Sequence, residues 1–388
     1  MLDYLSSRAR SVEPFHVMDL LARAQQMQAQ GREVVHLEVG EPDFATAQPI
    51  IDAGLAALRE QRTHYTPATG LPILRQAIAD YYARKFAVKI SAERVMITPG
   101  ASGALQLALT CLLDVGEEVL LSDPGYPCNR NIAQLLGIQT RSLPVTAEDQ
   151  YQLGATQIEK EWQASTRAAM VSSPSNPTGT RIETQHMQDL LAAVARKNGH
   201  LIVDEIYQGL VYDVEDCTAL QYSDDVFVVN SFSKYFGMTG WRLGWMVVPE
   251  AFVTAVDRMS QNLFLAASTV SQYAALAAFS SETETILQQR REEFQKRRDY
   301  LLPALQNLGF KVETRPQGAF YIYADCSAIT DDAYSWCHDL LEQAGVAVTP
   351  GIDFGDFKAS QHIRFAYTRP VKELQRAIEL IQIYLNNT

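Results

Sequence analysis

The segment Ser231–Trp245 reads Ser-Phe-Ser-Lys-Tyr-Phe-Gly-Met-Thr-Gly-Trp-Arg-Leu-Gly-Trp and follows the apolar run 226–229. That run predicts a buried strand, so Lys234 is expected in a turn just past its end. A lysine becomes a nucleophile toward carbonyls when burial and cationic neighbours lower its pKa, and Arg242 is a candidate neighbour. Taken alone, Lys234 and Arg242 fit a surface turn with a solvated lysine and a structural arginine about equally well.

Helices and strands alternate through the middle of the chain. Strands are predicted at 94–98, 118–122, 168–172, 200–204, 226–230 and 243–248, and helices at 49–60, 72–86, 100–113 and 184–197. This alternation predicts an open, mostly parallel sheet, in which ligands bind at the carboxyl ends of the strands. The polar or aromatic side chains expected at that edge are Ser102, Tyr126, Asn176, Asp204, Ser231 and Lys234.

Three of these positions are candidate ligand contacts, although each has a plainer interpretation. The turn 99–103 opens a helix whose free N–H groups suit a phosphate, but Ser102 also fits a simple helix cap. Asn176 offers an amide to a phenolate oxygen, while the run Asn-Pro-Thr-Gly is a good turn former in its own right. Asp204 ends a buried strand and therefore needs a cation, or else it caps the next turn.

The lysine segment, with Gly237, Gly240, Arg242 and Gly244 after Lys234, resembles the signature of the class I aminotransferases. These are pyridoxal-phosphate (PLP) enzymes of the aspartate aminotransferase fold, fold type I. The segment 40–44 resembles the family's G-x-P-D-F motif, and 173–179 resembles its S-x-x-N-P-T-G motif. Matching motifs run from about residue 36 to 369, so the resemblance covers nearly the whole chain.

The resemblance implies the PLP-dependent transferase fold, an α/β fold in which a large domain has a mostly parallel sheet between helices. A smaller α+β domain accompanies it. The expected division is an N-terminal segment 1–45 that joins the small domain, a large PLP-binding domain 46–285 and a small C-terminal domain 286–388. Outside the large domain, helices are predicted at 16–29, 282–307, 331–344 and 371–386, and strands at 34–39, 311–315, 320–324, 346–349 and 362–367.

The resemblance also implies a role for each site residue. Lys234 is expected to hold PLP as a Schiff base, Asp204 to keep its ring nitrogen protonated, and Tyr207 to contact its phenolic oxygen. These three are the expected catalytic residues. The further cofactor-binding residues are Ser102, Gly103, Tyr126, Asn176, Ser231, Arg242 and, from the partner subunit of a homodimer, Tyr65.

Gly40, Asn176 and Arg364 are expected to bind the substrate, with Arg364 holding the α-carboxylate through its bidentate fork. Four of the residues have structural alternatives. Tyr65 and Tyr126 also fit packed loop aromatics, the 40–44 segment also fits an ordinary turn, and Arg364 also fits an internal ion pair.

The expected function is transfer of an amino group from an L-amino acid to a 2-oxo acid with ping-pong kinetics. A PLP-dependent lyase, such as a carbon–sulfur β-lyase, is the first alternative because the same residues serve it. A non-catalytic ligand-binding regulator is a second, but it needs an added DNA-binding module. The segment 260–268 lacks the partner-subunit arginine of one dicarboxylate-specific subgroup, which permits neutral or aromatic substrates without excluding aspartate.

Composition limits the partners. Of the 388 residues, 33 are Lys or Arg and 45 are Asp or Glu, and the net charge of −12 disfavours nucleic acid and anionic membranes. The 5 cysteines have no C-x-x-C or zinc spacing, which predicts neither a disulfide nor a bound metal. No stretch of 18 apolar residues occurs, and a cytoplasmic location is expected.

Overall fold

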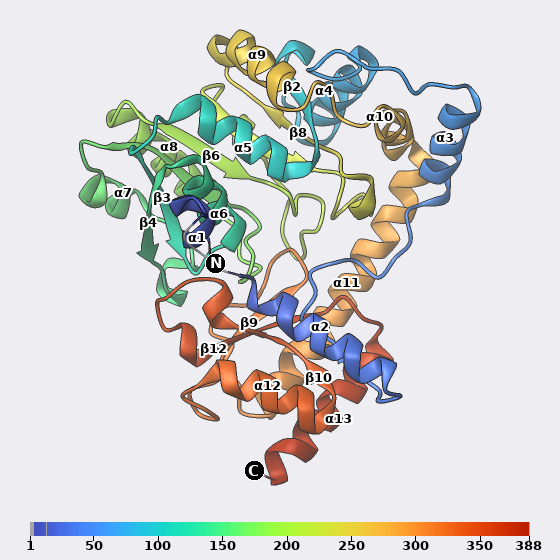
Figure 1. Ribbon diagram of the computed structural model, residues 1–388, viewed down its shortest axis with the longest axis vertical. Coiled ribbons are helices and arrows are strands. Elements are labelled where there is room, and N and C mark those ends of the chain that lie inside the picture. The colour runs from blue at the N-terminus through green and yellow to red at the C-terminus, as the bar shows by residue number, and fades with distance from the viewer. Residues whose placement is uncertain (1–3, 13, 388) are drawn as a thin grey trace.

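The computed structural model describes residues 4–12 and 14–387, and its largest element is a seven-stranded sheet (Figure 1). The strand order is β2 (Val95–Thr98), β8 (Gly244–Val247), β7 (Val226–Ser231), β6 (His200–Asp204), β5 (Thr166–Ser172), β3 (Glu118–Asp123) and β4 (Gln139–Pro144). Only β8 runs antiparallel to its neighbours; the other pairings are parallel. The prediction of a mostly parallel sheet is confirmed.

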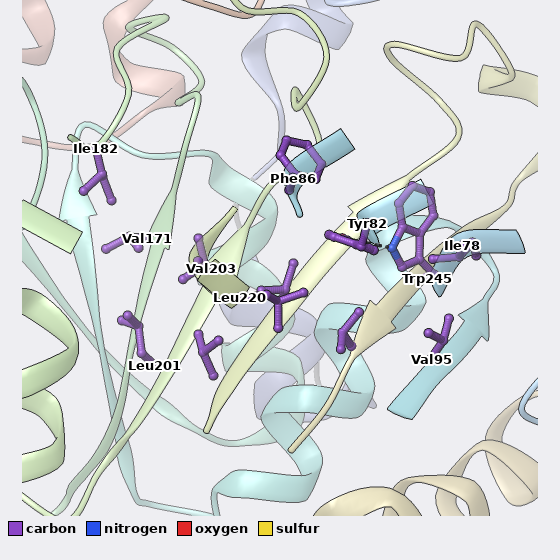
Figure 2. Packing of buried hydrophobic residues seen from close by; sticks show 14 of the residues in the cluster. Ile78, Tyr82, Phe86, Val95, Val171, Ile182, Leu201, Val203, Leu220 and Trp245 are labelled. Atoms are coloured by element: carbon purple, nitrogen blue, oxygen red, sulfur yellow. Dashed lines mark hydrogen bonds between the residues drawn. The ribbon is translucent and has the colours of Figure 1, made fainter. Parts of the chain in front are cut away.

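Both faces of this sheet are buried, which explains the continuous apolar runs in its strands. Successive side chains point to opposite faces: Val226 and Val228 pack into one core, and Phe227 and Val229 into the other. Figure 2 shows the first of these cores around Trp245 and Tyr82. The helices that accompany the sheet are α3 (Gln48–Arg59), α4 (Pro72–Phe86), α5 (Gly100–Leu112), α6 (Pro127–Leu136), α7 (Ala155–Glu161), α8 (Thr184–Arg196), α9 (Val253–Leu263) and α10 (Thr269–Leu276).

A smaller α+β part lies beside the large sheet, at the bottom of Figure 1. Its antiparallel sheet has the order β11 (Thr349–Pro350), β12 (His362–Ala366) and β9 (Tyr321–Asp325), and β1 (Val35–His36) pairs in parallel with β10 (Val346–Ala347). The helices here are α2 (His16–Ala29), α12 (Ala333–Ala344) and α13 (Val371–Asn387). A further short helix, α1 (Ser7–Ser11), contacts α6.

The long helix α11 (Ser281–Asn307) connects the two parts (Figure 1). Leu287 packs into the core of the large sheet, whereas Phe294 and Leu301 pack into the core of the small one. The helix therefore contributes side chains to both cores, and the boundary predicted at residue 285 falls inside it. The division into 1–45, 46–285 and 286–388 stays a prediction.

One predicted strand is wrong. Segment 311–315 makes a single bridge, between Lys311 and Asp325, and then leaves the sheet. The residues that follow form hydrogen bonds outside the small sheet. The Pro316 carbonyl accepts from Arg298, and the Gln317 amide donates to the Gly179 carbonyl. The strand predicted at 34–39 shortens to β1, since the Glu38 carbonyl accepts from side chains rather than from a neighbouring strand.

The elements α6, β4 and α7 were not predicted. The edge strand β4 reads Gln-Thr-Arg-Ser-Leu-Pro, so it lacks the apolar pattern by which the inner strands can be recognised. Within residues 4–12 and 14–387, no helix has the length and apolar character needed to cross a bilayer. In the same residues, His, Cys, Asp and Glu side chains form no group of three or more that suits a metal ion.

The core beside Trp245 generates a stability prediction. Trp245 is fully buried and its indole nitrogen donates to the Tyr82 hydroxyl at 3.3 Å. Trp245→Ala should lower the free energy of unfolding by about 3–5 kcal/mol, because it leaves a large cavity. Urea unfolding followed by circular dichroism measures this loss. Val115→Ala, at a side chain that is 82% exposed, is the control and should change it by less than about 0.5 kcal/mol; equal effects would contradict the packing described.

Candidate active site

A cavity of about 350 Å³ lies at the carboxyl ends of β5, β6 and β7, facing β9 and β12. Parallel strands leave such a crevice where their connections diverge to opposite faces of the sheet. The predicted site residues that line it are Gly40, Ser102, Tyr126, Asn176, Asp204, Tyr207, Ser231, Lys234, Arg242 and Arg364. Residues far apart in the sequence therefore converge on one cavity.

Lys234 follows β7, and its Nζ donates to the Gly40 carbonyl at 2.7 Å. The pKa of Lys234 is lowered to about 8, mainly by burial and also by Arg364 and Arg242, while Glu41 and Asp204 act in the opposite direction. About a tenth of the amine is thus neutral at pH 7, far more than at the ordinary lysine pKa of 10.5, as a nucleophilic lysine requires. The surface-turn alternative for this lysine does not fit its position.

Gly40 must be glycine for this contact to form. A Cβ at residue 40 would lie 2.0 Å from the Tyr321 hydroxyl, so any side chain would displace either the turn or the ring. A bidentate ion pair between Asp43 and Arg297, at 2.8 and 3.1 Å, also holds this turn in place. The G-x-P-D-F segment therefore holds a carbonyl group at the lysine.

Asp204 ends β6 and is 4% exposed. Burial raises the pKa of its carboxyl to about 6, although the Ile206 amide, at 3.0 Å, and Lys234 lower it. A buried carboxylate with one backbone donor is costly unless a cation faces it. The cavity beside Asp204 is the place from which such a cation can approach.

Tyr207 follows Asp204 by three residues, and its hydroxyl forms a hydrogen bond with the Tyr321 hydroxyl at 2.8 Å. Burial raises the pKa of Tyr207 well above its usual range, so the group stays protonated and can act as a hydrogen-bond donor. Tyr126 precedes α6 and lines the same cavity. Its ring lies 6.5 Å from that of Phe15.

One end of the cavity has a combination of groups that suits an anion. Gly100 opens α5 with φ +72°, and a Cβ there would lie 2.7 Å from Arg242 Nη2. The guanidinium group therefore lies against the first turn of the helix, where backbone N–H groups have no intrahelical partner. Ser102 and Ser231 line the cavity with Arg242, so a cation, two hydroxyls and a helix start are combined in one place.

Arg364, in the middle of β12, is 5% exposed and held by neutral acceptors. Nη1 donates to Asn176 Oδ1 at 2.9 Å, and Nη2 donates to the Glu38 carbonyl at 2.5 Å and to Thr349 Oγ1 at 3.2 Å. Its Nε has no partner, and the guanidinium stacks over the Tyr321 ring at 4.3 Å. In the part of the chain that the structure describes, no carboxylate pairs with it, which argues against the internal ion pair.

Two predicted residues lie away from the cavity. Gly103 is buried in α5, and a Cβ there would meet Pro99 at 3.0 Å and Phe264 at 3.5 Å. Tyr65 is 83% exposed on the loop before α4. Its predicted role lies in a second subunit and stays a prediction.

Several lining residues were missed. Phe15, Val17, Met18 and Leu21 come from the N-terminal segment and α2, and Asp353 and Phe354 come from the loop before β12. The helical pattern of 16–29 predicts that α2 has a buried face, but it gives no sign that other side chains of the helix meet a cavity. Only the packing of α2 against the small sheet brings them there.

Comparison with known proteins decides the family. The model of the family "Aminotransferase class I and II" matches residues 32–381. This chain belongs to that family. A (5-formylfuran-3-yl)methyl phosphate transaminase of Methanocaldococcus jannaschii is 36% identical over 98% of this chain and 100% of its own. A valine–pyruvate aminotransferase of Mycobacterium tuberculosis is 36% identical over 99% of both chains.

A solved structure of an aminotransferase from Mycobacterium tuberculosis has a TM-score of 0.96 at 36% identity and covers 100% of both chains. The predicted PLP-dependent transferase fold and the predicted aminotransferase are therefore confirmed, and the lyase alternative is not supported. The family is PLP-dependent. The cavity fits that group, because a buried carboxylate at Asp204 needs a cationic ring nitrogen and the start of α5 with Arg242 suits a phosphate.

The lowered pKa of Lys234 generates a prediction. Only the neutral amine attacks an aldehyde, and the neutral fraction rises as pH increases through the pKa of about 8. The rate at which PLP-free protein captures PLP should therefore rise with pH and level off above about pH 8–9. Stopped-flow absorbance measures this rate, with Lys234→Ala as the control that lacks the reaction. A midpoint near the ordinary lysine value of 10.5 would contradict the burial argument.

Proposed function

We propose that this cavity binds PLP and one amino acid at a time, and that the chain moves the amino group to a 2-oxo acid in two half-reactions. The supporting observation is that a lysine of lowered pKa, a buried carboxylate and an arginine with an unpartnered nitrogen share one cavity. When bound, PLP withdraws electrons from the bonds of the substrate α-carbon and so makes its proton acidic.

The residues near the sheet edge would hold the cofactor. Lys234 would provide the covalent attachment, and Asp204 would keep the ring nitrogen protonated. Tyr207 donates to the ring oxygen, and Asn176, whose Oδ1 is occupied by Arg364, retains its NH₂ group for the same oxygen. Tyr126 lines the same cavity, and its ring would hold the cofactor ring by an aromatic contact that adds about 1 kcal/mol beyond area burial.

Ser102, Ser231 and Arg242 would bind the phosphate together with the N–H groups at the start of α5, including those near Gly103. Tyr65 of a second copy would complete this group in a homodimer. Its exposure on a single chain supports the assignment, because a tyrosine that is 83% exposed has no packing role of its own. The 5 cysteines are all unpaired, which supports a reducing, cytoplasmic location.

Arg364 would bind the α-carboxylate of the substrate. Its Nη groups are already directed by neutral acceptors, so the positive charge is preorganised and not neutralised. The Gly40 backbone borders the same space. The neutral amine of Lys234 would take the proton from the substrate α-carbon and later return a proton as general acid.

The central test is the absorbance of purified protein with PLP, before and after single amino acids are added without any oxo acid. A transaminase converts the cofactor to its amine form under these conditions, and the 2-oxo acid appears in equal amount. Lys234→Ala should not show this conversion at a comparable rate. Release of pyruvate and ammonia with the cofactor form unchanged would instead support a lyase, and no cofactor band at all would overturn the proposal.

Replacing Arg364 tests the substrate site separately from the cofactor site. Arg364→Lys keeps the charge but loses the bidentate fork, so KM for amino acids should rise about 10- to 100-fold. The absorbance of bound PLP should stay unchanged. Arg376→Lys on the exposed face of α13 is the matched control and should leave KM unchanged. An unchanged KM in Arg364→Lys would show that the carboxylate binds elsewhere.

A further inference from the structure

A chain of hydrogen bonds between buried polar side chains connects the ends of β6 and β7, next to Asp204 and Lys234. The side chains are Glu205, Gln208 and Asn230, which are 2%, 3% and 2% exposed. All three lie outside the lining of the cavity, and the proposed function gives them no role. Burying such groups is costly unless their hydrogen bonds are satisfied, so their partners identify what they hold in place.

The hydrogen bonds of this chain all run in one direction. The pairing of β6 with β7 stops before the last two residues of β7. Beyond this point, the Ser231 amide donates to Asn230 Oδ1 at 2.7 Å. Asn230 Nδ2 donates to Gln208 Oε1 at 3.0 Å, and Gln208 Nε2 donates to Glu205 Oε2 at 2.9 Å. Every donor therefore points from Ser231 toward Glu205.

Glu205 sets this direction because it ends the chain as an acceptor. Its Oε2 accepts from Gln208, and its Oε1 accepts from the Ala219 amide at 2.7 Å. The pKa of Glu205 is raised to about 8, mainly by burial, so the carboxyl is largely uncharged near neutral pH. In either protonation state both carboxyl oxygens can accept, whereas a side-chain amide accepts at only one atom. Gln208 must therefore turn its NH₂ group toward Glu205 and its oxygen toward Asn230.

At its other end, the chain holds a residue of the proposed phosphate site. Ser231 Oγ accepts from the Ser233 amide at 3.0 Å and donates to the Leu243 carbonyl at 3.2 Å. The side chains of Ser231 and Ser233 both line the cavity. A shift of the backbone at the end of β7 would therefore move two hydroxyl groups of the cavity together.

The end of β7 also lies against the first turn of α5. A Cβ at Gly244 would lie 2.7 and 2.9 Å from backbone atoms of the first two residues of α5. The same Cβ would lie 2.9 Å from the Asn230 carbonyl oxygen. Asn230 and the helix start are thus separated only by a glycine. The distance between Ser231 and the N–H groups of the helix start therefore depends on where Asn230 is held.

We propose that Glu205 is a positioning residue for the cofactor phosphate. Through Gln208 and Asn230 it fixes the end of β7, and with it the Ser231 hydroxyl, against the start of α5. This inference rests on the proposed function, in which that hydroxyl and the helix start bind the phosphate. Disturbing the chain should weaken the binding of the phosphate group and leave the rest of the cofactor site intact.

Glu205→Gln tests this role, because it keeps the size of the side chain but places an NH₂ group where an acceptor is needed. The Kd of the PLP-free protein for PLP should rise about tenfold. The Kd for 5′-deoxypyridoxal, which has the same ring and aldehyde but no phosphate, should change less than about twofold. Absorbance titration near neutral pH measures both values. Equal changes in the two Kd values, or no change in either, would overturn the inference.

Glu118→Gln is the matched control. Glu118 is another buried glutamate of the large sheet, 8% exposed, but it begins β3 at the sheet edge opposite the cavity. Its replacement removes the charge that pairs with Arg141 and should change neither Kd by more than about twofold. A loss of PLP affinity equal to that of Glu205→Gln would show a general effect on the sheet and overturn the inference.

Exchanging the two side chains should restore the direction of the chain. In the double variant Glu205→Gln with Gln208→Glu, the carboxyl at position 208 can accept from Asn230 and from the amide at position 205. The Kd for PLP should return to within about threefold of the wild-type value. A network that only adds stability predicts no such recovery, because the exchange adds a second change to a packed site. Failure to recover PLP affinity would overturn the role of Glu205 as the terminal acceptor.

The same titrations separate this inference from the proposed function. If the wild type binds both aldehydes and Glu205→Gln binds them equally well, the cofactor site stands and the role of Glu205 is overturned. If the wild type binds neither aldehyde, both proposals are overturned.

Discussion

The hydrogen bond between Lys234 Nζ and the Gly40 carbonyl joins the end of a central strand to the N-terminal segment of the chain. It exists because glycine lets the backbone approach Tyr321 and because the Asp43–Arg297 ion pair holds the turn. Enclosure between the two parts of the fold removes water from the amine and lowers its pKa. The reactivity of the lysine is thus a product of tertiary structure.

The burial that lowers the pKa of Lys234 also affects the charged side chains beside it. Asp204 and Arg364 are both buried, and the hydrogen bonds that hold them come from backbone, amide and hydroxyl groups and not from an oppositely charged side chain. Such groups cost stability in the free protein but are already oriented when a ligand of complementary charge arrives. A ring cation and a substrate carboxylate are ligands of this kind. Stability and binding therefore compete at this site.

Much of this could be predicted from the sequence, because apolar strands followed by polar turns are local patterns. The positions of Asp204, Asn176 and Lys234 at one sheet edge follow from the topology rule for parallel strands alone. The place of α2 beside the cavity and the cap that Asp353 provides at its start could not be predicted, since they depend on packing between segments more than 300 residues apart. The polar edge strand β4 was missed for a different reason, because its sequence has no apolar alternation.

The central claim is that Lys234, placed at a strand end and partly enclosed, is the attachment point of the cofactor. Borohydride reduction of the PLP-loaded protein makes that bond permanent, and peptide mass spectrometry then locates it. A pyridoxyl group on the peptide that contains Lys234, in about equal amount with the protein, is the predicted result. A label on another lysine, or none on a protein that has bound PLP, would contradict the account.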